Sequence, residues 1–220
     1  MSGRPAAGGG RWVEVAPERL ERWLDGFADR HGGVREVVGD STAVRFEAAD
    51  GAVAECHPPF GPLASSSGDP RAALLTHALL PRRVGVLLVR LGGFAVGVFD
   101  GDRLVASKVD TRLVHGRHKK GGSSQQRFAR RREGQVRELT QAAADVVARV
   151  LLPELASLDA VVAGGDRSAV TAVLADGRLA AVVDKLTDRF LTVPDPRRAV
   201  LDGTPALFRA VHVRLTEPPG

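Results

Sequence analysis

The amino-acid sequence predicts an α/β (α+β) protein in which helices flank a mixed β-sheet. Two features carry this prediction. Three strand-like runs follow one another between residues 84 and 109, and the turn signals Gly92-Gly93 and Asp100-Gly101 join them, which is typical of an antiparallel meander. A long amphipathic helix comes next, and strands and helices then alternate. This order makes an α/β layer with a mixed sheet.

The first 80 residues predict a smaller α+β region. Residues 1–10 are rich in Gly and Ala, and we expect a disordered tail there. Between residues 17 and 31 apolar side chains recur at helical spacing, and Pro17 suits the first turn of a helix. The other expected elements are strands at 12–15, 34–38, 42–48 and 53–56, a linker rich in Pro, Gly and Ser at 58–70, and a helix at 69–80. We expect Trp12 and Trp23 to fill the core of this region.

The remaining residues predict a second region that contains the meander. The expected elements are strands at 84–90, 94–99 and 103–109, a helix at 124–152, a strand at 160–163, a helix at 166–174, a strand at 190–193, a helical turn at 196–201, and a strand or helix at 207–215. We place the boundary near residue 80, so residues 11–80 and 81–216 are expected to form separate domains.

Length and composition set limits on the function. The chain has 220 residues, 44% of them hydrophobic, which is enough to bury a core. Cys56 is the single cysteine, so an intramolecular disulfide and a multi-cysteine zinc site are excluded. The N-terminus has no apolar segment of the kind that a signal peptide contains, and no apolar run approaches ~20 residues. We therefore expect a cytoplasmic protein without a membrane span.

Positive charge is concentrated in one segment of the chain. Between Thr111 and Arg132 there are eight Lys and Arg residues and no Asp or Glu, so the rest of a chain of net charge +5 carries 5 − 8 = −3. Such a segment favours contact with phosphates. The residues expected to hold a nucleic-acid backbone are Arg117, Lys119, Lys120, Arg127, Arg130 and Arg131.

Glycines and side-chain amides lie in the middle of this basic segment. Gly121 and Gly122 allow the backbone to approach a crowded substrate closely. Gln125 has no titratable group and is excluded as a general base, but it can position a water molecule and donate hydrogen bonds to a developing oxyanion. That chemistry suits hydrolysis of an ester whose leaving group is a ribose hydroxyl. Gln126 is the alternative candidate for the same role.

A purely structural interpretation of the segment is also open. Ser123 and Gln126 have the spacing of a capping box, in which the serine oxygen and the glutamine side chain each satisfy a backbone N–H at the helix start. The arginines would then form a solvated face of the helix. This interpretation leaves Gln125 and the absence of acidic residues unexplained, and the connection from Asp110 to Ser123 is long for a compact domain.

At these residues the sequence resembles the middle domain of eukaryotic- and archaeal-type class 1 peptide-chain release factors, over residues 83–215. In those proteins a Gly-Gly-Gln tip precedes an Arg-Phe-Ala-Arg helix start. The matching segments are Gly121-Gly122, Arg127-Phe128-Ala129-Arg130, His115-Gly116-Arg117, the meander with Asp100-Gly101, and Val161-Val162-Ala163-Gly164-Gly165. The resemblance implies an RNase H-like release-factor domain and a peptidyl-tRNA hydrolase.

The segment departs from that pattern after the two glycines. Ser123 stands where the tip glutamine is expected, and the first glutamine is Gln125. This Gly-x-x-Gln form resembles the Vms-like release factors of ribosome quality control, in particular their actinobacterial branch. The resemblance implies a glutamine tip that acts on peptidyl-tRNA held by a stalled ribosome or large ribosomal subunit. Nothing in the 220 residues looks like a domain that reads stop codons, so we expect release that is independent of the codon.

The resemblance leaves the scissile bond open. It is the peptidyl ester or a phosphodiester near the tRNA 3′ end, and a non-catalytic ribosome- or RNA-binding module is the further alternative. The expected partners are peptidyl-tRNA and the large ribosomal subunit, with no membrane. We expect a monomer that needs no cofactor and no metal ion.

Three other groups of residues are better explained by structure than by chemistry. Asp100 and Asp102 flank a hairpin turn, which favours turn aspartates over metal ligands. The segment 164–168 lacks the Lys and the spacing of a Walker motif and predicts a helix cap. Cys56 and His57 are neighbours in a strand, so they point to opposite faces and do not form a nucleophile–base pair.

Overall fold

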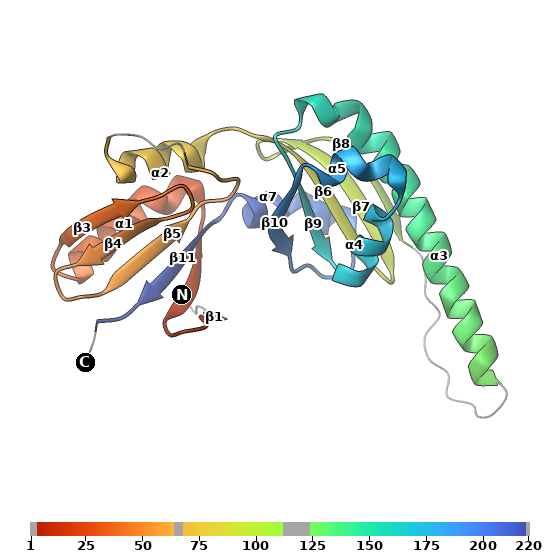
Figure 1. Cartoon of the computed structure of the whole chain (residues 1–220), viewed down its shortest axis with the longest axis horizontal. Coiled ribbons are helices and arrows are strands. Elements are labelled where there is room, and N and C mark those ends of the chain that lie inside the picture. The colour runs from red at the N-terminus through yellow and green to blue at the C-terminus, as the bar shows by residue number, and fades with distance from the viewer. Residues whose placement is uncertain (1–3, 64–67, 112–123, 219–220) are drawn as a thin grey trace. The chain divides into compact units, whose positions relative to one another are not determined.

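The protein, seen here in a computed structural model, is described for residues 4–63, 68–111 and 124–218, with the backbone alone described for residues 124–132. Figure 1 shows the chain. It divides into two compact units, of which one combines Met1–Leu80 with Ala206–Gly220 and the other consists of Pro81–Pro205.

The first unit is a six-stranded antiparallel sheet with helices on one face (Figure 1). The strands have the order β1-β2-β11-β5-β4-β3. The elements are β1 (Arg4–Pro5), β2 (Arg11–Val15), α1 (Pro17–Arg30), β3 (Val34–Gly39), β4 (Val44–Ala48), β5 (Val53–His57), α2 (Pro70–Leu79) and β11 (Val211–Thr216). A short helix, α7 (Pro205–Phe208), leads into β11.

Alternation along β2 decides which side chains of this unit reach the core. Val13 and Val15 are buried with Leu20 and Phe27 of α1. Trp12 therefore points to the opposite face of the sheet, where its ring centroid lies 5.5 Å from that of His57. The expectation that Trp12 fills the core is wrong for this reason. Trp23, in contrast, is partly buried against the core and stacks on Phe27.

Two expected domain boundaries differ from the structure. Strand β11 lies between β2 and β5 in the sheet of the first unit, with Val211, Val213 and Leu215 buried. The second unit therefore ends at Pro205 and not at residue 216, because the apolar face of β11 completes a sheet whose other strands lie far away in the sequence. In the expected disordered tail, Arg4 and Pro5 form β1 and pair with β2.

The second unit contains the predicted mixed sheet, with the strand order β10-β9-β6-β7-β8. Its elements are β6 (Arg83–Arg90), β7 (Gly93–Asp100), β8 (Arg103–Thr111), α3 (Ser124–Leu151), β9 (Ala160–Gly165), α4 (Arg167–Leu174), α5 (Ala180–Val183), β10 (Leu186–Leu191) and α6 (Arg198–Asp202), with short 3₁₀ helices at Leu152–Ser157 and Gly177–Leu179. The meander β6-β7-β8 is antiparallel, and β6, β9 and β10 are parallel. The predicted α+β class and the three-strand meander are confirmed.

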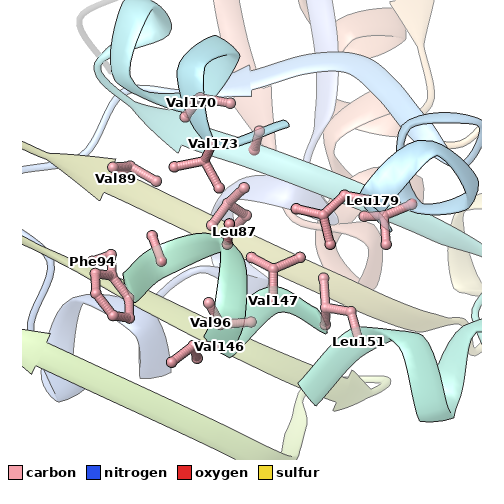
Figure 2. Close-up of a cluster of buried hydrophobic side chains, with 14 of the residues drawn as sticks. Leu87, Val89, Phe94, Val96, Val146, Val147, Leu151, Val170, Val173 and Leu179 are labelled. Atoms are coloured by element: carbon pink, nitrogen blue, oxygen red, sulfur yellow. The ribbon is translucent and has the colours of Figure 1, made fainter. Parts of the chain in front are cut away.

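One face of this sheet supplies the core that holds the long helix. Figure 2 shows Leu87, Val89, Phe94 and Val96 of the meander against side chains of α3 and α4. From α3 come Val146, Val147 and Leu151, and from α4 come Val170 and Val173. The apolar periodicity that predicts the helix thus corresponds to a buried face.

Candidate functional site

The predicted site residues lie at the start of α3 and in the segment before it. Arg117, Lys119, Lys120, Gly121 and Gly122 fall outside the described residues. The other five positions, Gln125, Gln126, Arg127, Arg130 and Arg131, lie in the first turns of α3, whose backbone is helical from Ser124 onward. Their side chains are not described, so the roles given to them by the sequence stay predictions.

Helix α3 carries these positions away from the core of the second unit. It has 28 residues, which corresponds to about 42 Å at 1.5 Å per residue. Leu139 is the first buried residue in the part of the helix whose side chains are described, which begins at Glu133. Figure 1 shows the N-terminal end of α3 running past the sheet. The site positions therefore occupy the projecting part of a helix whose C-terminal half is fixed.

The fixed half of α3 is held by a continuous apolar stripe. Leu139, Ala143, Val146, Val147 and Leu151 are all buried in the core shared with the sheet and α4. Their steps of four, three, one and four residues keep them on one face of the helix. Because interiors are close-packed, this stripe determines both the direction of the helix and its rotation about its own axis.

A polar contact on the opposite side of the same half adds a second fixed point. The Arg178 guanidinium lies 2.7 Å from Oδ1 of Asp145 in α3 and 2.6 Å from Oδ2 of Asp176. The Gln141 amide donates to the same Asp145 oxygen at 3.1 Å. Hydrogen bonds from the Arg178 side chain are the main cause that lowers the pKa of Asp176 to about 2 and lowers the pKa of Asp145. Arg178 and Asp145 are exposed, so their contact orients the helix more than it stabilises the fold.

The chain that enters the basic segment is fixed as well. Strand β8 ends at Thr111, and Gly93 of β7 lies directly opposite. Gly93 has φ 150°, and a Cβ there would lie 2.4 Å from the carbonyl oxygen of Asp110. Glycine is required at this close approach of the two strands. The described chain therefore leaves β8 at a paired residue, Thr111, and resumes at Ser124 in the projecting part of α3.

Electrostatics at the start of α3 favours an anionic partner. The first turn contains no acidic residue, and residues 124–132 contain four arginines. Unpaired N–H groups give a helix N-terminus a partial positive charge, and this charge repels cationic side chains in the first turn. Positions 127, 130 and 131 lie on one face of the helix because they are three and four residues apart. This arrangement is unfavourable within the protein and becomes favourable when phosphates neutralise it.

The structure also shows the contacts of the residues to which the sequence analysis gave a purely structural role. Asp166 caps α4, accepting from the Ala169 N–H at 3.0 Å and from the Ser168 hydroxyl at 2.6 Å, which lowers the pKa of Asp166. The predicted helix cap is confirmed. Cys56 is buried, and burial raises the pKa of its thiol to about 12, while His57 lies 3.0 Å from Glu55.

The described residues contain neither a cluster of metal ligands nor a helix that could span a membrane. Asp100 lies 3.5 Å from Arg103 across the β7–β8 turn. Within residues 4–63, 68–111 and 124–218 there is no group of three or more His, Cys, Asp and Glu residues that could hold a metal ion. No helix in these ranges is long and apolar enough to cross a bilayer.

The chain is similar to known proteins both in sequence and in structure. The chain shares 31% identity over 97 residues with "Peptide chain release factor subunit 1" of Archaeoglobus fulgidus, which is 44% of this chain and 23% of that protein. The match thus spans about a quarter of the relative. Among solved structures, the "Vms1 mitochondrial localization core" gives a TM-score of 0.46 at 12% identity, covering 93% of this chain and 82% of the other. The archaeal translation termination factor aRF1 gives 0.44 at 12% identity, covering 90% and 66%.

The family match is more extensive than the match to the single archaeal protein. It runs from residue 82 to residue 214. It therefore includes the meander strands β6, β7 and β8, the projecting helix α3, and all elements of the second unit that follow α3. Because this match covers more than half of the 220 residues, the chain belongs to the Actinobacteria/chloroflexi VLRF1 release factor family.

Proposed function

We propose that this release factor is a codon-independent peptidyl-tRNA hydrolase that frees nascent chains from stalled ribosomes or large ribosomal subunits in the cytoplasm. The observation that carries the proposal is that residues 124–132, which contain four arginines and no acidic residue, form the projecting start of a helix whose other half is packed into the core. Such a probe suits a narrow site lined with phosphates. Family membership supports release as the overall activity.

In the proposed reaction Gln125 is the catalytic residue at the tip. It holds a water molecule against the ester carbonyl carbon of peptidyl-tRNA and donates a hydrogen bond to the developing oxyanion. The water oxygen bonds to the carbonyl carbon, the bond from that carbon to the ribose oxygen breaks, and the ribose oxygen takes up a proton. Gly121 and Gly122 give the backbone room beside the ester. Glutamine does not titrate, so the reaction uses positioning and not general-base catalysis.

The cationic residues hold the RNA around that bond. Arg117, Lys119 and Lys120 precede the tip, and the arginines of α3 follow it. Phosphate contacts from such residues give affinity without reading sequence, as release that is independent of the codon requires. In this proposal the protein acts as a monomer on peptidyl-tRNA in the large subunit and uses no cofactor.

The test is single-turnover release from large subunits that carry peptidyl-tRNA labelled in the peptide. We expect Gln125→Ala to lower the release rate by about 100- to 1000-fold, as loss of an oxyanion donor does elsewhere, while binding to the subunit is kept. Gln135→Ala is the matched control, because Gln135 is an exposed glutamine of the same helix beyond the tip. Gln126→Ala is compared in parallel, and a larger loss there would move the catalytic role to Gln126.

The products distinguish the alternatives in the same experiment. Free peptide together with a tRNA of intact 3′ end supports ester hydrolysis. A peptide that stays attached to a short 3′ fragment would identify a nuclease. Binding without any cleavage would leave a non-catalytic RNA-binding module, and an unchanged rate in both glutamine variants would contradict the proposed tip.

A further inference from the structure

Within the first unit, the helices α1 and α2 cover one face of the sheet and leave the other face open (Figure 1). The open face carries the side chains that alternate with the buried ones, and in the described strands these are exposed or partly exposed. Three aromatic rings meet there, on the neighbouring strands β2, β11 and β5. The Trp12 ring centroid lies 5.5 Å from that of His57 and 6.4 Å from that of His212.

The pairing register places two carboxylates beside these rings. Across β2, β11 and β5 it forms two rows of outward-facing residues, Trp12–Arg214–Glu55 and Glu14–His212–His57. Trp12 and His57 stand at opposite corners of this grid, and Glu14 and Glu55 stand at the other two. The corners are two strand spacings of about 4.8 Å apart across the sheet, so the indole must extend over β11 to come within 5.5 Å of His57. The aromatic rings thus lie between two glutamates.

Both glutamates keep their negative charge available to a partner. The side chain of Glu14 is 60% exposed and lies 3.7 Å from Nε2 of His212. The side chain of Glu55 is 34% exposed and lies 3.0 Å from Nε2 of His57. Among the described residues, neither carboxylate forms an ion pair with an arginine or a lysine. A neutral imidazole that donates a hydrogen bond leaves the charge of a carboxylate in place.

The arginines beside them are already occupied. Arg45 lies 2.8 Å from Glu47, and Arg35 contacts the same carboxylate. The Arg214 guanidinium donates to backbone carbonyl oxygens of the β1–β2 turn at 3.2 and 3.4 Å. The whole first unit contains ten Arg and twelve Asp or Glu residues, so its net charge is 10 − 12 = −2. The open face therefore attracts cations and not anions.

We infer that an indole site, made of Trp12, Glu14, Glu55, His57 and His212, binds an arginine- or lysine-bearing peptide segment of another protein. A cationic group lies against the Trp12 ring, because the face of an indole attracts cations. Glu14 and Glu55 accept charge-assisted hydrogen bonds from that group or from a second cationic side chain of the same segment. The inference goes beyond the proposed function, whose residues all lie in the second unit.

A cationic peptide fits this surface better than a single-stranded nucleic acid does. An aromatic ring on an open sheet face can also stack with a base, but the phosphates on either side of that base require cations. Arg45 and Arg214 are occupied, and the carboxylates of Glu14 and Glu55 repel phosphates. The charges of the face therefore favour the peptide.

The test is binding of a short dye-labelled peptide, in which Arg and Gly alternate, to the whole protein. Fluorescence anisotropy measures the affinity over a series of salt concentrations. We expect Trp12→Leu to weaken binding about tenfold, because the contact between the cation and the ring is lost. Trp12→Phe keeps a weaker aromatic ring and should bind with intermediate affinity. It also covers the case in which leucine disturbs the sheet. Unchanged binding by both variants would overturn the inference.

The role of the two carboxylates is tested by Glu14→Gln together with Glu55→Gln, which removes charge and keeps side-chain size. We expect this double change to weaken binding about five- to tenfold at low salt and to reduce the salt dependence. Glu21→Gln together with Asp29→Asn is the matched control, because it removes two exposed carboxylates of α1 from the same unit. The control should bind as the wild type does. Equal losses in the two double variants would overturn the inference by showing a nonspecific attraction.

The fluorescence of Trp12 tests the competing nucleic-acid partner. Trp23→Phe leaves Trp12 as the single tryptophan of the chain. We expect its emission to change when the Arg–Gly peptide is added and to stay constant with a single-stranded RNA oligonucleotide of mixed sequence. A change with RNA would overturn the inference in favour of a base-stacking surface. The assay contains no ribosome, so its failure leaves the proposed release activity standing, and normal release by Gln125→Ala leaves the indole site standing.

Discussion

From Leu139 to Leu151 helix α3 is held by buried side chains, whereas from Ser124 to Arg132 it carries four arginines and no acid. The two halves belong to one uninterrupted helix of 28 residues. The side chains of the second half are packed against the sheet. The comparison teaches that the core contacts and the proposed RNA contacts are placed on different parts of one element. Substitutions should therefore separate the two properties.

The largest expected effect on stability comes from the packed half. Leu151 is fully buried, and we expect Leu151→Ala to lower the free energy of unfolding by about 2–5 kcal/mol, the usual range for a buried leucine. Val136→Ala removes a partly buried side chain before Leu139 and should cost less than about 1 kcal/mol. Urea denaturation followed by circular dichroism measures both. Equal losses would show that the helix before Leu139 is packed as firmly as the part that follows it.

The largest expected effect on binding comes from the projecting half. Changing Arg127, Arg130 and Arg131 together to Ala should weaken binding to large subunits and lower the slope of log K against log salt by about two to three. The free energy of unfolding should stay nearly constant. Arg149→Ala, which removes an exposed arginine from the packed half, is the control and should leave the slope unchanged. A similar change of slope in both proteins would remove the distinction between the halves.

The smallest expected effect is a change in how the free energy of unfolding depends on pH. The pKa of Asp176 is lowered to about 2, and that of Asp145 is also lowered, mainly by hydrogen bonds from Arg178. A carboxyl whose pKa is lower in the folded state contributes stability above its unfolded pKa of about 3.9, and this contribution disappears as the pH falls through the folded value. Arg178→Ala should therefore destabilise the protein slightly at pH 7 and hardly at pH 2.

Urea unfolding of the wild type, Arg178→Ala and Arg149→Ala at several pH values between 7 and 2 checks this prediction. The difference between the wild type and Arg178→Ala should shrink toward pH 2, while Arg149→Ala should show no such trend. A difference that stays constant with pH would mean that the Arg178 contacts do not persist in solution.

Elements with a strong local pattern were predictable, and those that depend on distant partners were not. The meander and α3 follow from turn signals and apolar periodicity within a single stretch of chain. Strand β10 begins at Leu186, earlier than the predicted residue 190, because Leu186 pairs with Val161 of β9 ahead of a register shift, and the residues between Leu186 and Phe190 show no strand pattern in the sequence. Trp12 was misplaced because its size suggested a core residue, although its neighbours Val13 and Val15 occupy the inner face of β2.

The candidate site likewise has features that the sequence predicts and features that only the structure shows. The charge and the amide residues of the tip are visible in the sequence, and the structure adds the length and direction of the helix that carries them. The contact of Asp145 with Arg178 was missed, since 33 residues separate the two. The tip roles of Gln125 and Gln126 stay predictions.

The position of β11 has a consequence for how the chain is made. The residues of the second unit are synthesised before β11, yet β2 and β5 both pair with that last strand. Domains generally fold as units during synthesis, so residues 81–205 can fold while the first unit still lacks the central strand of its sheet. Until β11 arrives, two strands keep unpaired edges, which are templates for pairing with other chains. A nascent chain of this release factor thus has a stage in which its second unit can be complete while its first unit still exposes two unpaired strand edges.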